Sequence, residues 1–75
     1  MKSKFTAIIR EEEGMYVAFS PELDVASQGE NPDQALAHLQ EAVELFLETA
    51  SPAEIQGRIS PNAWFTQFEA EVATA

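Results

Sequence analysis

The chain has 75 residues, with 13 Asp and Glu against 4 Lys and Arg, and its formal net charge is −9. This length fits a single domain over residues 1–75, and the scarcity of cations argues against direct binding to nucleic acid or to anionic lipid. The sequence contains no Cys, which excludes disulfides and thiolate metal sites. Its apolar runs are too short to cross a membrane and it begins with no apolar signal core, so we expect a soluble, cytoplasmic protein.

Three short apolar segments at the start of the chain predict an antiparallel β-meander. Residues 5–10 are rich in aromatic and β-branched side chains, as is typical of a strand. An acidic connector that ends at Gly14 predicts a hairpin turn, with the return strand at residues 15–19. Pro21 ends that strand because proline cannot donate to a sheet ladder, and a short third strand follows at residues 25–28.

The strongest helix signal covers residues 32–49. Asn31 is a favoured N-cap, Pro32 suits the first helical position, and apolar residues then recur at helical spacing along one side. The Ser-Pro-Ala-Glu sequence at residues 51–54 repeats this start signature as a capping box. Because Gly57 follows so closely, we expect at most a short helical turn there.

The final segment, residues 63–72, alternates apolar and polar side chains with a period of two, which predicts a last strand. The predicted order is therefore β-β-β-α-β, an α+β fold with one long helix on one face of the sheet. A right-handed crossover through the helix would place the fourth strand parallel to the first and beside it.

The first two strands are apolar on both sides, although the long helix covers only one side. Large exposed apolar surfaces mark interaction sites, so we expect another chain to cover the open side. That chain is either a second copy or a different protein. The alternative is that polar side chains let this side face water, namely Thr6, Arg10, Ser27 and Gln67.

Acidic residues dominate the middle of the chain. Between Glu11 and Gly57 there are eleven Asp and Glu and no Lys or Arg. On the predicted helix, Glu41, Glu44 and Glu48 repel one another at spacings of three and four residues. A basic protein partner would neutralise them, while the alternative is a solvated acidic face whose repulsion is screened by salt.

The residue types of a catalytic or metal site are too scattered to assemble one. His38 is the only His, so a two-His metal motif is impossible. The serines have no obvious base partner, the glycines form no phosphate loop, and the acids at residues 11–13 suit a solvated turn. We therefore predict no enzymatic activity, no cofactor and no metal. A metal-dependent nuclease that uses clustered carboxylates is the least favoured alternative.

Several segments together resemble the HicB-like antitoxin family. Met-Tyr-Val-Ala-Phe-Ser-Pro-Glu-Leu at residues 15–23 leads into Ala-Ser-Gln-Gly-Glu at residues 26–30, and the Ala, Leu and Glu pattern of residues 35–48 follows in the family's order and spacing. Residues 65–70 resemble the closing strand of the family. The resemblance implies a partial ribonuclease H-like module with the β-β-β-α-β order.

The resemblance also implies a function in a toxin–antitoxin system. HicB-like antitoxins bind and neutralise HicA-type toxins, which are small basic ribonucleases that cleave messenger RNA. We expect partner binding by Tyr16, Phe19, Glu22, Asp24 and Gln28, and a homodimer or higher homo-oligomer. The sequence ends near the last predicted strand, so we expect no DNA-binding segment and no autorepression by this chain alone. The alternative function is a self-associating structural module with no toxin partner.

Overall fold

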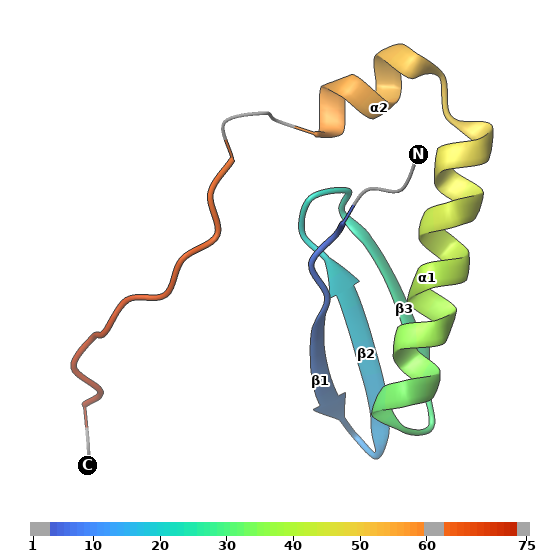
Figure 1. The fold of residues 1–75 in the computed structure, drawn as a ribbon. Helices are drawn as coiled ribbons and strands as arrows, with labels where there is room; N and C mark the ends of the chain where they lie inside the picture. The colour runs from blue at the N-terminus through green and yellow to red at the C-terminus, as the bar shows by residue number, and fades with distance from the viewer. Residues whose placement is uncertain (1–3, 60–62, 74–75) are drawn as a thin grey trace.

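The structure is a three-stranded antiparallel sheet with one long helix packed on one face (Figure 1). This computed structural model describes residues 4–59 and 63–73. Its elements, in chain order, are β1 (Ile8–Glu12), β2 (Met15–Ser20), β3 (Val25–Gly29), α1 (Pro32–Thr49) and α2 (Pro52–Arg58). The predicted α+β class, the antiparallel meander and the long helix are confirmed.

A two-residue turn joins β1 to β2 and sets the register between them. Glu13 and Gly14 both have positive φ angles, of 51° and 83°, as a type I′ turn requires. Such a turn matches the right-handed twist of the flanking strands, so the ladder continues without a bulge from Glu12 opposite Met15. The predicted hairpin, with Gly14 in the left-handed region, is confirmed.

The first strand begins three residues later than the sequence predicts, at Ile8 rather than at Phe5. The register places Ile8 opposite Phe19, close to the end of β2. The backbone N–H of Thr6 instead donates a hydrogen bond to Oε2 of Glu22, at 2.7 Å. The segment before β1 therefore lies outside the ladder, although Phe5 still packs against the hydrophobic core.

The helix α1 has the bounds that its capping signals predict. The side-chain oxygen of Asn31 accepts a hydrogen bond from the backbone N–H of Gln34, at 2.7 Å. The side chain of Gln34 accepts in turn from the N–H of Glu30, at 2.6 Å. These two hydrogen bonds satisfy the backbone donors of Gln34, in the first turn, and of Glu30, just before the cap, and they fix where the helix begins.

The helix α2 is longer than the predicted turn and contacts the turn between β2 and β3. Ser51 caps it by accepting from the N–H of Glu54, at 3.1 Å. At its other end, Arg58 donates from Nη1 to the carbonyl oxygen of Leu23, at 2.6 Å, and its guanidinium lies 4.7 Å from the ring centroid of Phe46. These contacts join α2 to both the β2–β3 turn and α1.

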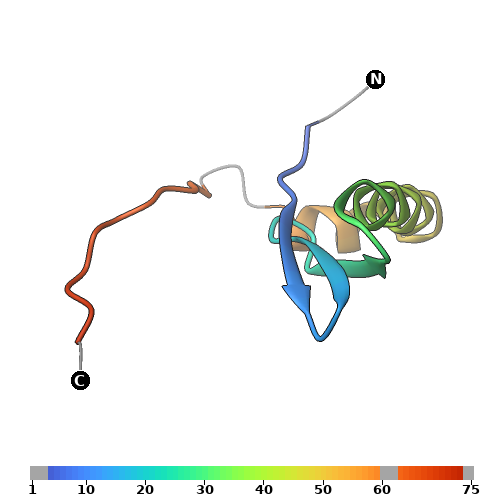
Figure 2. The same ribbon diagram turned by 90° about the horizontal axis from the view of Figure 1, so that it is seen from below.

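The hydrophobic core lies between the sheet and one side of α1. Its buried side chains are Ala18, Leu23, Ala35, Leu39 and Val43. The helix packs most closely on β3 and β2 and least on β1, and in Figure 2 it lies on the β3 side of the sheet. The part of the sheet near β1 is therefore left without helical cover on this face.

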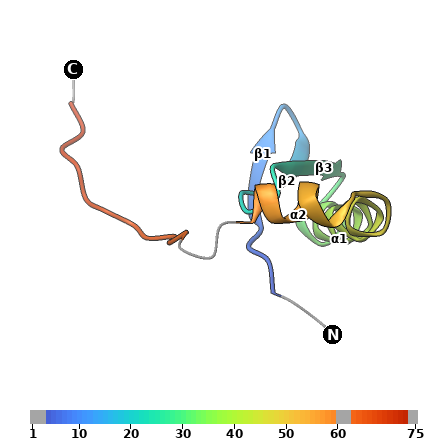
Figure 3. The same cartoon turned by 90° about the horizontal axis from the view of Figure 1, so that it is seen from above.

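The predicted fourth strand is not part of the sheet in the described structure. Residues 63–73, which we call the C-terminal arm, run away from the strands, and Figures 1 and 3 show the arm and α1 on opposite sides of them. Trp64 and Phe68 on the arm are 89% and 88% exposed. The alternating pattern predicts a locally extended backbone, but it does not specify the edge with which that backbone pairs.

Candidate interaction surface

The register of the sheet sorts its side chains onto two faces. Ile8 lies opposite Phe19 and Arg10 lies opposite Val17, so these four side chains share one face. Gln28 lies opposite Val17 from β3 and joins them. Because Ala18 and the other buried sheet residues point toward α1, this set lies on the opposite side, which we call the open face. The prediction of apolar side chains on both faces is confirmed.

A shallow hollow on the open face combines acidic and apolar groups next to the hairpin. It is lined by Glu12, Glu13, Met15, Val17 and Gln28. Glu12 forms an ion pair with Arg10, and Met15 is 36% exposed. The carboxylates at the edge can attract a cationic group, while the apolar floor can be covered by an apolar side chain of the same partner.

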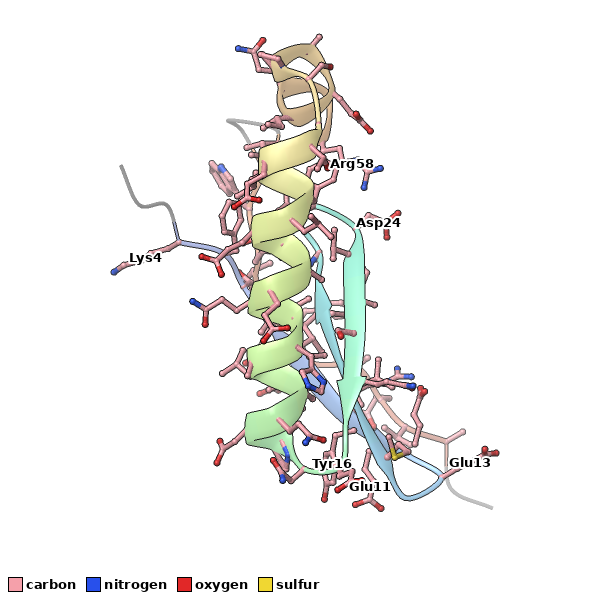
Figure 4. All side chains as sticks on the ribbon, turned by 90° about the vertical axis from the view of Figure 1, so that its right-hand side faces the viewer. Lys4, Glu11, Glu13, Tyr16, Asp24 and Arg58 are labelled. Atoms are coloured by element: carbon pink, nitrogen blue, oxygen red, sulfur yellow. The ribbon has the colours of Figure 1, made fainter. Side chains whose placement is uncertain are left out.

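The five residues predicted to bind a partner do not form one patch. Phe19 and Gln28 lie on the open face, whereas Tyr16 lies on the helix face and packs against the core. Glu22 and Asp24 belong to the turn between β2 and β3. Figure 4 shows Asp24 at the opposite end of the sheet from Tyr16 and the hairpin.

Tyr16 is engaged by a neighbour within the hairpin. Its hydroxyl donates a hydrogen bond to Oε2 of Glu11, at 2.9 Å (Figure 4). This hydrogen bond and the negative charge of Glu11 raise the pKa of Tyr16. The ring faces the core and the hydroxyl is hydrogen-bonded to Glu11, so Tyr16 stabilises the hairpin and is not part of the open face.

Glu22 is also engaged inside the fold. One carboxylate oxygen accepts from the N–H of Thr6, and the other accepts from the hydroxyl of Ser20 at 3.3 Å. Partial burial acts to raise the pKa of Glu22, but hydrogen bonds from donors of Glu22 itself, Thr6 and Ser20 outweigh it and hold the pKa below its ordinary value. Glu22 therefore holds the segment before β1 against the β2–β3 turn.

This arrangement predicts a loss of stability in acid that depends on Glu22. Because its pKa is lower in the folded protein, ionised Glu22 stabilises the fold above the unfolded value of 4.5, and this contribution is lost as the pH falls through the folded pKa. We expect the unfolding free energy of Glu22→Gln, measured in urea, to depend less on pH below 4.5 than that of the unsubstituted protein. Glu48→Gln, on the exposed side of α1, serves as the control. Identical pH profiles for Glu22→Gln and the unsubstituted protein would contradict this assignment.

Asp24, like Gln28, is exposed and available to a partner. It has a φ of 57°, a left-handed conformation that Asp tolerates better than most residues. Its backbone N–H donates to the carbonyl oxygen of Ser20, at 2.9 Å, which closes the turn.

The single His has a structural contact. His38 is exposed on α1, and its Nδ1 lies 2.7 Å from the carbonyl oxygen of Gln28, to which it donates. This hydrogen bond links α1 to β3. Within residues 4–59 and 63–73, no three His, Asp or Glu side chains lie close enough together to hold a metal ion.

A second hollow, on the helix face beside the segment that leads into β1, is predominantly apolar. We call it the apolar groove, and its apolar lining includes Phe5, Ala7, Leu36, Val43, Leu47 and Ile59. Four polar residues also line it, namely Thr6, Ser20, Gln40 and Glu44. Leu36 is 45% exposed although it lies on the side of α1 that faces this groove. Sequence reasoning did not identify the groove, because the predicted fourth strand would occupy this position.

Sequence reasoning also missed most residues of the hollow on the open face. Met15 and Val17 are in the predicted return strand, and Glu12 and Glu13 were assigned to a solvated connector. The signal that could have found them is the two-residue turn at Glu13 and Gly14, because it fixes which residues lie opposite one another.

Comparison with protein-family models, with curated proteins and with solved structures finds no match for this chain. Among the described residues, no helix has the length and apolar character needed to span a membrane.

Proposed function

We propose that this chain is a non-catalytic, antitoxin-like cytoplasmic protein that binds and neutralises a small basic HicA-type ribonuclease. The observation that carries the proposal is the distribution of charge, since eleven acids and no Lys or Arg lie between Glu11 and Gly57. The ion pairs among the described residues, Arg10 with Glu12 and Arg58 with Glu54, leave most of these carboxylates without a cation from the same chain. A basic partner would supply those cations.

The open face provides a surface that suits such a partner. A ribonuclease that cleaves messenger RNA needs cationic side chains near its catalytic centre in order to hold phosphates. The hollow places the carboxylates of Glu12 and Glu13 beside the apolar side chains of Met15 and Val17. Binding there would cover the cationic surface of the ribonuclease and keep RNA away. The attraction should speed association and weaken as salt is added.

We further propose that the complete fold is the partial ribonuclease H-like module. In this arrangement the C-terminal arm adds to the sheet beside β1 and parallel to it, as a fourth strand. Trp64, Phe68 and Val72 share one side of an extended arm, so all three can enter the apolar groove together. The proposal concerns the shape of the module, and the chain acts by binding rather than by catalysis.

A charge reversal at the hollow tests the binding surface. The probe is any small basic protein that is encoded next to this chain, and its affinity is measured by titration calorimetry. We expect Glu13→Lys to weaken binding about tenfold at low salt, because it places a cation where the partner's own cations approach. Glu41→Lys changes the net charge equally but lies on the exposed side of α1, and we expect it to have a much smaller effect.

Two results would count against this surface. If Glu13→Lys and Glu41→Lys weaken binding equally, net charge alone determines affinity and the hollow is not the contact. If the unsubstituted chain binds no adjacent basic protein, the antitoxin proposal itself is wrong.

The second candidate function is a self-associating module with no toxin partner. The observation that favours it is β1, an edge strand whose five residues are all exposed. Unpaired edge strands present backbone donors and acceptors that readily pair with another chain. The two functions are compatible, since a homo-oligomer can also bind a ribonuclease.

A further inference from the structure

We propose that two copies of this chain exchange their C-terminal arms, so that the arm of each copy fills the apolar groove of the other beside β1. This inference rests on the fourth-strand proposal and does not depend on the ribonuclease proposal. The second copy supplies the residues that complete each sheet.

The arm has an apolar side that is largely exposed. Trp64, Phe68 and Val72 are 89%, 88% and 81% exposed. Every second residue of an extended backbone lies on the same side, so Trp64, Phe68 and Val72 share one side of the arm. Thr66 and Ala70 lie on that side as well. The other side of the arm carries Gln67, Glu69 and Glu71 in addition to Phe65, and is therefore mainly polar.

The apolar groove presents matching surface in the same molecule. It lies between Leu36 and Val43 of α1 and the Phe5 segment that leads into β1. The edge of β1 beside it has no neighbouring strand among the described residues. An added strand would satisfy the edge hydrogen bonds and place its apolar side in the groove.

The surface available is sufficient for a stable dimer. A buried Trp or Phe side chain removes about 150–250 Å² from water, so Trp64 and Phe68 of two arms contribute about 600–1,000 Å². The groove walls and the β1 edge add their own buried surface to this. Stable protein interfaces bury about 1,200–2,000 Å² in total, a range that the reciprocal exchange reaches.

The position of the arm favours exchange over docking in the same chain. The radius of gyration is 14.8 Å, whereas a compact chain of this length has about 11 Å. The arm runs away from its own sheet, and three residues separate Ile59, which lines the groove, from Ala63 at the start of the arm. Short connections to a terminal element favour its exchange between identical chains, because the same contacts form in the other copy.

Trp64 is the only Trp, so its fluorescence reports whether the arm is docked. The full-length chain is diluted over a wide concentration range, and Trp emission is recorded together with the mass from light scattering. At high concentration we expect blue-shifted Trp emission and a mass of twice the 8.3 kDa of one chain. On dilution we expect the emission to shift to the red and the mass to fall to that of a monomer. Blue-shifted emission from a monomer at every concentration would show docking within one chain and overturn the exchange. Red-shifted emission at every concentration would overturn both the exchange and the fourth strand.

Two substitutions on α1 locate the docking site. Leu36→Glu places a charge in the apolar groove, and we expect a monomer with red-shifted Trp emission at every concentration. Leu45→Glu makes the same change on the opposite side of the helix, where Leu45 is already 60% exposed, and we expect it to behave like the unsubstituted chain. Helical circular dichroism confirms that both variants are folded. Exchange that survives Leu36→Glu would overturn the proposed site.

Discussion

Replacing Leu23 with alanine is expected to lower the unfolding free energy by about 2–5 kcal/mol, a large share of the stability of a domain this small. Leu23 is fully buried, although it lies in the turn between β2 and β3 rather than in a strand. Its side chain belongs to the core with Ala18 and Leu39, and its carbonyl oxygen accepts from Arg58. The substitution removes packing that neither the sheet nor α1 can replace.

Urea unfolding followed by circular dichroism measures the effect of Leu23→Ala. The matched control is Leu45→Ala, which removes the same atoms from an exposed position on α1 and should change stability by less than about 0.5 kcal/mol. Equal losses for the two variants would show that Leu23 has no special place in the core.

Gly29→Ala is the second substitution with a large expected effect. A Cβ atom at this position would lie 2.5 Å from the backbone N of Ala35 and 2.8 Å from the carbonyl carbon of Gln34. Both are backbone atoms of α1, so no side chain can rotate away to make room. The end of β3 and the first turns of α1 must separate, and we expect a loss of about 1–3 kcal/mol or more.

Gly57→Ala provides the opposite case for comparison. Gly57 lies within α2, and a Cβ there would meet nothing within 4 Å. Alanine at this position should stabilise the protein by about 0.4–1 kcal/mol, because it restricts the unfolded chain and suits a helix. Melting temperatures of the two variants should therefore move in opposite directions. An unchanged or raised melting temperature for Gly29→Ala would contradict the close approach of β3 and α1.

Local signals were sufficient to predict most of the secondary structure. Asn31 and Pro32 mark the start of α1, and the cap contacts that they predict are formed. Gly14 marks the hairpin because its φ of 83° suits glycine. Both features depend on residues close together in the sequence, which is why a single sequence reveals them.

Contacts between distant residues could not be predicted in this way. The start of β1 depends on the hydrogen bond from Thr6 to Glu22, and the place of α2 depends on the contact of Arg58 with Leu23. The five predicted binding residues span β2, the turn after it and β3. Strand alternation places Tyr16 on the helix face and Phe19 on the open face, so the five residues were divided between surfaces.

RNA cleavage is the most direct test of the proposal that this chain neutralises a basic ribonuclease. Any small basic protein that is encoded next to this chain is incubated with messenger RNA, alone and with increasing amounts of the full-length chain. We expect cleavage to stop near an equimolar ratio, and we expect Glu13→Lys to inhibit less effectively than Glu41→Lys. Unchanged cleavage in the presence of a large molar excess of this chain would contradict the claim.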